Sequence, residues 1–498
     1  MTPDHVDVLI IGAGLSGIGA AHHLQERCPG RTYAILESRD AIGGTWDLFR
    51  YPGVRSDSDM YTLGYAFKPW KEAKSIADGP SILDYVRETA TDGDIERHIR
   101  FHHRVVGAQW SSQDARWTVR AQRTDTGETV EMTCRFLLSC AGYYRYDEGY
   151  TPQFKGRERF KGEIVHPQHW PEDLDYAGKN VVVIGSGATA VTIVPAMAET
   201  AAHVTMLQRS PSYVISLPAI DPIADFVRRF LPTKLAYSVV RWKNVMLGSL
   251  IFNVSRRRPT FMKKLIRSGV VRQLPEGFDV DTHFRPRYNP WDQRMCLVPN
   301  ADLFKALSNG TASMVTDQIA TFTETGIKLG SGDELEADVI VTATGLNMLV
   351  FGGIDLTVDS DEIAMPDTMA YKGTMLSGVP NFAYSIGYTN ASWTLKCDLT
   401  CQYVCRLLNH MRDRGYDTCT PVNNDPTVVG EPLLDFSSGY VQRSIHLFPQ
   451  NGSRAPWKLR QSYPRDVIAL RYGQLEDGTL RFSRIPLPAE RPAESVAA

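Results

Sequence analysis

Three glycines near the start of the chain have the spacing of a dinucleotide-binding turn. Gly12, Gly14 and Gly17 form GxGxxG in VDVLIIGAGLSGIGAAHHL, between an expected strand and an expected helix. The first glycine permits a tight turn, the second lets a pyrophosphate approach the backbone, and the third lets the helix pack closely on the strand. The next expected strand, TYAILE, ends at Glu37. A carboxylate there would accept hydrogen bonds from ribose hydroxyls and would repel a 2′-phosphate.

A second turn repeats this unit in NVVVIGSGATAVTIVPAM. Gly185, Gly187 and Ala190 form GxGxxA, and the strand that follows, HVTMLQR, ends at Arg209. A cation therefore stands where the first unit has an acid, and Ser210 follows it. An arginine at this place suits the 2′-phosphate of NADP.

The two turns together predict two different cofactors, FAD at the first and NADPH at the second. A flavin that meets a nicotinamide receives hydride from it, so the pattern indicates an oxidoreductase. The alternative is a pair of ordinary turns between strand and helix. That alternative does not explain why the strand, the helix and the terminal residue match at both places.

Composition indicates an ordinary globular protein and excludes several classes. The 498 residues are 43% hydrophobic and 22% charged, with a net charge of −2, so no overall field favours nucleic acid. We see no signal peptide at the start and no apolar run of the roughly 20 residues that a membrane span needs. Eight cysteines without a CxxC pair suit a reducing cytoplasm, where we expect the protein.

We expect no metal site. The closest cysteines, Cys397, Cys401 and Cys405, are four residues apart on an expected helix. They fit small residues on a buried helix face better than ligands.

The expected fold class is α/β, with two Rossmann-like domains for FAD and NADPH. RFLLSCAGYY (135–144) and ADVIVTATGLN (337–347) read as buried strands where the chain crosses between domains. The predicted boundaries are 1–142 for the first part of the FAD domain, 143–342 for the NADPH domain, and 343–498 for the second part of the FAD domain with the C-terminal region. A basic helical insertion is expected in the NADPH domain at about 215–285.

Two further segments carry a resemblance to a known family. FKGEIVHPQHWP resembles the FxGxxxHxxxW[PD] fingerprint of type I Baeyer–Villiger monooxygenases at Phe160, Gly162, His166, Trp170 and Pro171. GGTWDLFRYPGVRSD is similar to that family's other signature at Gly43, Gly44, Trp46, Arg50, Tyr51, Pro52, Gly53 and Asp57. RYNPWDQRMCLVPN and GYTNASWTLK look closest to the ethionamide-activating monooxygenase subgroup, whose members oxygenate ketones and soft sulfur compounds.

The resemblance implies a reaction and roles for its residues. NADPH reduces FAD, and O₂ then forms a C4a-peroxyflavin that inserts oxygen next to a ketone carbonyl. Arg294 falls at the family's active-site arginine, and Asp57 would orient it. The implied FAD contacts include Ser16, Thr45, Trp46 and Val105, and the implied NADP contacts include Ser186, Ala188, Thr189 and Gln293. Tyr51 would shape the flavin pocket and Trp393 the substrate pocket.

Two of the family's positions raise alternatives. Many members have Lys where this chain has Gln293, so binding of the NADPH 2′-phosphate would depend more on Arg209. His166 would act through the linker, in NADPH handling and domain movement, rather than as a general base. The plainer interpretation is that His166 and Trp170 only pack the junction.

The predicted function is NADPH- and O₂-dependent oxidation of a small ketone to an ester or lactone, with sulfoxidation as a side activity. The alternative is an S- or N-oxygenase of the flavin-containing monooxygenase type, acting on a thioether, thioamide or amine. A disulfide reductase would need a CxxC or CxxxxC pair, which the sequence lacks. A flavoprotein without turnover would not need two complete cofactor sites.

A basic stretch raises a separate question. Residues 226–275 contain twelve basic residues and no Asp or Glu, which gives this stretch a charge of +12. Because the net charge of the whole chain is −2, the remaining residues carry −14. One interpretation is a peripheral contact with an anionic membrane, which would give access to lipophilic substrates. The other is a solvated helical cap whose field attracts NADPH. The basic residues are Arg228, Arg229, Lys234, Arg241, Lys243, Arg256, Arg257, Arg258, Lys263, Lys264, Arg267 and Arg272.

Overall fold

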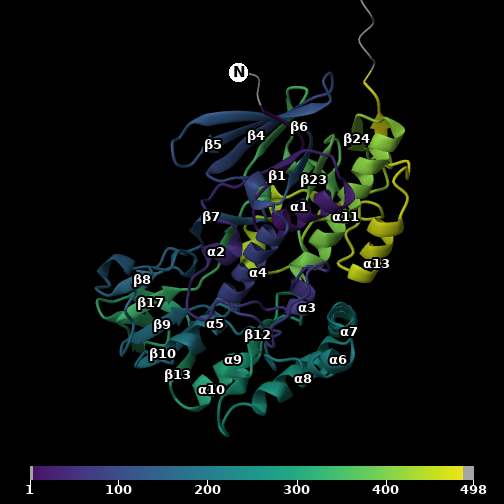
Figure 1. Cartoon of the computed structure of the whole chain (residues 1–498). Coiled ribbons are helices and arrows are strands. Elements are labelled where there is room, and N and C mark those ends of the chain that lie inside the picture. The colour runs from purple at the N-terminus through teal and green to yellow at the C-terminus, as the bar shows by residue number, and fades with distance from the viewer. Residues whose placement is uncertain (1–3, 486–498) are drawn as a thin grey trace, which may run out of the picture.

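The computed structural model describes residues 4–485, which form two α/β units and a group of projecting helices (Figure 1). Residues 1–3 and 486–498, at the two ends of the predicted FAD domain, lie outside the described part. The larger unit holds both ends of the described chain, and the smaller unit is built from its middle (Figure 1).

The larger unit is built on a sheet with nine strands among the described residues. At its centre β1 (Asp4–Ile11) pairs in parallel with β2 (Tyr33–Leu36) on one side and β6 (Thr129–Ser139) on the other. Beyond β2 lies β3 (Ile99–Arg100), which gives the order β3-β2-β1-β6. The apolar run from Val8 to Ile11 is buried on both faces, as a central parallel strand requires.

The remaining strands of this sheet lie beyond β6 or pair with it. They are β4 (His103–Ser111), β5 (Arg116–Arg123), β19 (Asp355–Val358), β20 (Asp361–Glu362) and β23 (Phe382–Tyr384). Helix α1 (Leu15–Arg27) follows β1 and packs against α11 (Trp393–Arg414), so the end of the chain returns to the first unit. Shorter helices in this unit are α2 (Thr45–Leu48), α3 (Met60–Leu63), α4 (Gly79–Asp92), α12 (Gly439–Gln442) and α13 (Tyr463–Val467).

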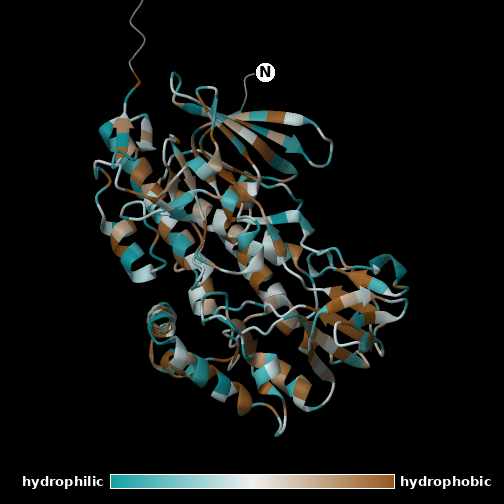
Figure 2. Ribbon diagram, turned by 180° about the vertical axis from the view of Figure 1, so that it is seen from behind, coloured by the Kyte–Doolittle hydropathy of each residue, from teal (hydrophilic) through white to brown (hydrophobic). Residues whose placement is uncertain are grey.

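The smaller unit repeats the same order of strands. Within the described residues, its sheet has the strand order β13-β10-β9-β17-β8, and all neighbouring strands are parallel. Figure 2 shows hydrophobic residues along these strands. The strands are β8 (Glu163–Val165), β9 (Asn180–Ile184), β10 (His203–Gln208), β13 (Ala312–Thr316) and β17 (Val339–Thr342), with α5 (Ala188–Met197) after β9 and α10 (Asp302–Ser308) before β13. Each sheet has the 3-2-1-4 order of a dinucleotide-binding unit.

The chain crosses between the units twice, and the two crossings pair with each other. Strand β7 (Tyr144–Gly149) follows β6, and β18 (Leu346–Met348) follows β17. The two run antiparallel, with Leu346 opposite Gly149. Each expected buried strand ends just before its glycine, at Gly142 and at Gly345, and the chain then continues into the short antiparallel pair.

Three helices project from the smaller unit: α6 (Pro222–Phe230), α7 (Thr233–Arg257) and α8 (Pro259–Val271) (Figure 1). The predicted α/β class, with two Rossmann-like units and a helical insertion, is confirmed. Between residues 4 and 485, no helix combines the length and the hydropathy that crossing a bilayer requires.

Candidate active site

A cavity of about 1280 Å³ extends between the two glycine-rich turns. Its wall includes Gly12 and Gly14 from the first turn and Gly185 and Gly187 from the second. Asp57 and Arg294 also line it. The cavity exceeds the roughly 300–1,000 Å³ of a typical small-molecule site, so it has room for more than one ligand.

The first turn forms a cradle closed by Glu37. This buried carboxylate accepts hydrogen bonds from the backbone N–H of Ala13 at 2.7 Å and of Arg39 at 3.0 Å. Two N–H donors hold the carboxylate in place, and it still has lone pairs for further donors. Val105 on β4 is buried and lines the cavity beside it. Backbone amides at a helix start and a fixed acid suit a pyrophosphate and a ribose without a 2′-phosphate.

The second turn is open to the cavity. A Cβ on Gly187 would meet no atom within 4 Å, so nothing of the chain blocks a ligand from this backbone. Ser186 and Thr189 line the cavity, while Ala190 lies within α5 on its buried face. Further residues of the predicted NADP site also lie in the wall: Ala188, Arg209, Ser210 and Gln293. Arg209 is exposed and makes no ion pair with any residue from 4 to 485.

The segment 43–57 joins the two units across the cavity. Its start packs on the first turn, since the N–H of Gly43 donates to the carbonyl of Ala13 at 3.2 Å. Further along, Gly53 lies against α5, where a Cβ would come within 2.8 Å of the Ala196 methyl. Arg55 then forms an ion pair with Asp302 at the start of α10. These contacts explain why the segment needs a glycine and an arginine in addition to its pocket residues.

Tyr51 has a second role besides the one expected for it. It lines the cavity and also packs into the core of the smaller unit. Burial raises the pKa of Tyr51 to about 12, so the phenol keeps its proton. Trp46 and Thr45, by contrast, stay on the side of the first turn, where the Thr45 hydroxyl lies 3.0 Å from the Tyr146 hydroxyl.

The structure brings Arg294 and Asp57 together as a two-point ion pair. Arg294 Nε lies 2.7 Å from Asp57 Oδ2, and Nη2 donates to Oδ1 at 2.9 Å. The Asp57 charge raises the pKa of the Arg294 guanidinium further above its already high value. About 34% of the Arg294 side chain and 26% of the Asp57 side chain remain accessible, and both residues face the cavity. A permanent cation is therefore held in a fixed orientation at the cavity wall.

Three tyrosines near Arg294 were not predicted from the sequence. Tyr143 and Tyr144 follow β6, and Tyr440 belongs to α12, far along the chain. Enclosure in the protein raises the pKa of each phenol. A pair of tyrosines directly after a strand that ends at the site was a usable signal, but nothing local marked Tyr440.

Trp393 lies at the start of α11 and contacts both the first turn and this aromatic wall. Its indole Nε1 donates to Ser16 Oγ at 2.8 Å, and its ring centroid lies 5.0 Å from that of Tyr143. Ser16, predicted as a cofactor contact, in turn donates to Cys397 Sγ at 3.2 Å. Trp393 lines the cavity, and its place in a substrate pocket stays a prediction.

The fingerprint segment 160–171 forms the joint between the units and is partly a strand, which we did not expect. Its middle is β8, at the edge of the smaller sheet, and a Cβ on Gly162 would meet the Asp338 carbonyl at 2.3 Å. Phe160 and Trp170 pack against two different cores of the smaller unit, and Pro171 is half-buried beside Trp170.

His166 ties this joint to the second crossing. Its Nδ1 accepts from the N–H of Gln168 at 3.1 Å, which leaves Nε2 to donate to the carbonyl of Gly345 at 3.2 Å. Gln168 donates to the carbonyls of Arg145 and Tyr146 on β7, both at 2.9 Å. Burial lowers the pKa of His166. The ring lines a small neighbouring pocket with Tyr51, and the linker role of His166 stays a prediction.

Comparison with known proteins places this site in a family. A sequence profile described as "Flavin-binding monooxygenase-like" matches residues 6–359. The FAD-containing monooxygenase EthA of Mycobacterium tuberculosis (strain ATCC 25618 / H37Rv) is 56% identical over 486 residues, covering 97% of this chain and 99% of that protein.

Two solved structures share the fold. A steroid monooxygenase bound to NADP aligns with a TM-score of 0.76 and 21% identity over 96% of this chain and 100% of that one. OTEMO in complex with FAD and NADP aligns with a TM-score of 0.73 and 22% identity over 97% of this chain and 100% of that one.

Proposed function

This chain belongs to the flavin-binding monooxygenase-like family, and we propose that it acts as a Baeyer–Villiger monooxygenase on ketones, with FAD and NADPH as cofactors. The overall reaction consumes a ketone, O₂, NADPH and a proton, and it yields an ester or lactone, NADP⁺ and water. Bound FAD, once reduced by NADPH, supplies the oxygen atom that it takes from O₂.

The residues of the cavity suit both cofactors. The first turn, with Glu37 and Val105, would hold FAD, because its backbone donors and fixed carboxylate match a pyrophosphate and an unphosphorylated ribose. The second turn would hold NADPH, with Arg209 and Ser210 at its ribose phosphate. Segment 43–57 contacts the first turn and helix α5, which follows the second turn, and it would therefore hold the two cofactors in a fixed relative position.

The observation that carries the proposal is the ion pair of Arg294 with Asp57 at the cavity wall. Attack on a ketone carbon moves negative charge onto the carbonyl oxygen, and a cation fixed beforehand stabilises that charge without reorganising. Arginine keeps its proton, so it provides charge without acting as an acid. Asp57 prevents the guanidinium from turning away, because it holds two of its nitrogens.

One observation favours the second candidate, an S- or N-oxygenase acting on a thioether, thioamide or amine. Tyr143, Tyr144 and Tyr440 supply phenol protons near Arg294. Transfer of oxygen to a sulfur or nitrogen lone pair needs an electrophilic oxygen, and a nearby hydrogen-bond donor favours that. The balance between the charge of Arg294 and these hydroxyls decides between the two reactions.

A pair of matched substrates separates the candidates. The FAD-loaded protein is given NADPH, ¹⁸O₂ and either an aliphatic ketone or a thioether of equal chain length. We expect an ester that carries one ¹⁸O atom at a rate above that of sulfoxide formation. Mass spectrometry of the products measures both. Sulfoxide formation without any ester would exclude the ketone reaction and leave the S-oxygenase.

Arg209→Ala is expected to raise the KM for NADPH about 10- to 100-fold, the range for loss of a hydrogen bond between charged partners. Arg209 has no other ion pair within the described chain, so its loss should leave little else unpaired. NADH is the internal control, because it lacks the 2′-phosphate and its KM should change little. Steady-state oxidation of both nucleotides measures this, and an equal change for both would contradict the assignment.

A further inference from the structure

We propose that helices α6, α7 and α8 form an interfacial membrane-binding surface for anionic bilayers. Of the nineteen exposed large hydrophobic residues in the described chain, thirteen lie between residues 222 and 271. An exposed apolar surface of this density marks an interaction site. They are Ile223, Phe226, Phe230, Leu235, Val239, Trp242, Met246, Leu247, Leu250, Ile251, Phe261, Leu265 and Val271.

Helix α7 has apolar residues on two opposite faces. The face that includes Ala236, Tyr237, Val240 and Val245 is buried against the larger unit. The opposite face repeats at helical spacing and is exposed. It consists of Leu235, Val239, Trp242, Met246 and Leu250. A surface helix needs only one apolar face for packing within its own chain, so the second face is available to a partner.

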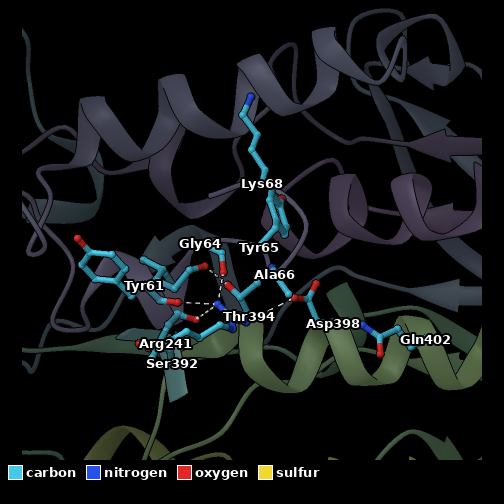
Figure 3. Close-up of polar contacts among 12 residues, drawn as sticks. Tyr61, Gly64, Tyr65, Ala66, Lys68, Arg241, Ser392, Thr394, Asp398 and Gln402 are labelled. Carbon is cyan, nitrogen blue, oxygen red and sulfur yellow. Dashed lines mark hydrogen bonds and ion pairs between the residues drawn. The ribbon is translucent and has the colours of Figure 1, made fainter. Parts of the chain in front are cut away.

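A buried charge network fixes α7 on the body of the protein (Figure 3). Arg241 is one of the twelve basic residues of the stretch, but only 5% of it is exposed. Its Nη1 donates to the carbonyls of Tyr61 and Gly64, both at 2.7 Å. Its Nη2 lies 3.5 Å from Asp398 on α11. Arg241 therefore works as an anchor to the larger unit rather than as part of the basic surface.

The far end of α7 is held as well. Arg256 Nη1 lies 2.7 Å from Asp292, next to the loop that carries Arg294. Asn244 adds a hydrogen bond to Asp59 at 2.8 Å in the middle of the helix. Arg241, Asn244 and Arg256 thus attach α7 to the rest of the protein at three points. The exposed apolar face is therefore already ordered before a partner binds, so binding costs less conformational entropy.

The charge around this face favours an anionic partner. Seven basic residues of the stretch make neither an ion pair nor a side-chain hydrogen bond within residues 4–485, and no acidic residue lies between 226 and 275. Two copies of this surface would repel each other, whereas anionic headgroups would attract it. The seven are Arg229, Lys234, Arg257, Arg258, Lys263, Lys264 and Arg272. Lipid headgroups beside an apolar interior match both features of the surface.

Vesicle co-sedimentation of the FAD-loaded full chain tests the proposal without any turnover, so it is independent of the proposed function. The vesicles contain either phosphatidylcholine alone or phosphatidylcholine with phosphatidylglycerol. We expect pelleting with the anionic vesicles, weaker pelleting at high salt, and little with the neutral ones. A protein that stays in the supernatant with both would overturn the proposal.

Two double variants separate the apolar and the charged contributions. Arg257→Ser with Arg258→Ser should lower the partition coefficient about 30-fold at low salt, since each basic residue near the surface contributes about 1 kcal/mol. Phe226→Ser with Phe230→Ser, whose side chains are 63% and 71% exposed, should lower it at least about tenfold. FAD content measured beforehand shows that each variant is folded.

The matched control is Ile468→Ser with Tyr472→Ser, which removes side chains 67% and 75% exposed outside these helices. It should bind like the unmodified chain. Equal losses in this control would mean that binding is not localised on α6–α8. A change of oligomeric state in the Phe226 and Phe230 variant, with vesicle binding unaltered, would show that the surface contacts a second copy instead.

Discussion

Replacing Arg294 by alanine is expected to lower kcat/KM for ester formation about 10³-fold or more while NADPH is still oxidised. Loss of a single fixed donor to a developing oxyanion costs about 10²–10³-fold, and here a full charge is lost as well. The Asp57 carboxylate would then lie in the cavity wall without its partner and would repel developing negative charge. Product and hydrogen peroxide are measured together, and we expect peroxide to rise as ester falls.

Two variants control this prediction. Arg294→Lys keeps a charge but cannot contact both oxygens of Asp57 as a planar fork, so we expect an intermediate loss of roughly 100-fold. Arg97→Ala breaks an exposed ion pair with Asp94 at 3.1 Å; neither residue lines the cavity, so the rate should be unchanged. Full ester formation by Arg294→Ala would show that the substrate's charge is stabilised elsewhere.

Replacing Gly17 by alanine is expected to give a chain that purifies without FAD. A Cβ at this position would lie 1.8 Å from the Gly12 carbonyl oxygen, which is far too close for two atoms that are not bonded to each other. Either the helix must move away from β1 or the turn itself must open. Both changes displace the backbone donors that would face the pyrophosphate, so the loss should affect cofactor content more than the remaining fold. Flavin absorbance per chain and thermal unfolding measure the two effects separately.

Gly269→Ala provides the control for Gly17→Ala. Gly269 lies in α8, where a Cβ meets nothing within 4 Å, and alanine there should raise stability by about 0.5–1 kcal/mol with FAD retained. The second turn offers a natural comparison, because it has Ala190 at the position that corresponds to Gly17. A Gly17→Ala protein with one FAD per chain and an unchanged melting temperature would contradict the close-approach argument.

Much of the cofactor-binding framework is readable from the sequence because it is local. A nucleotide turn needs its glycines, its strand and its helix within about 20 consecutive residues, and the next strand end supplies the residue that selects the ribose. The contrast between Glu37 and Arg209 therefore appears directly in the chain. The same locality predicts the helical insertion, because apolar periodicity and the absence of acids mark residues 226–275 without any tertiary information.

For two features, the sequence predicted the general character but not the contacts. Residues 160–171 read as a junction, but the sequence did not reveal that β8 within them belongs to a sheet. Three residues of strand at a sheet edge have no visible alternation, so their pairing depends on β17, far along the chain. Arg241 read as part of a basic surface, because a lone arginine on a helix carries no sign that a carboxylate on another helix will cover it.

The sequence by itself determined the two nucleotide turns, the order of the two units and the residue types that the chemistry needs. Only the tertiary structure decided which of those residues meet. Arg294 and Asp57 are 237 residues apart, and Tyr440 reaches the same wall from the last part of the described chain. Such contacts depend on how two sheets, their crossings and the C-terminal helices pack together. That packing is a sum over many weak long-range interactions, and no short segment contains it.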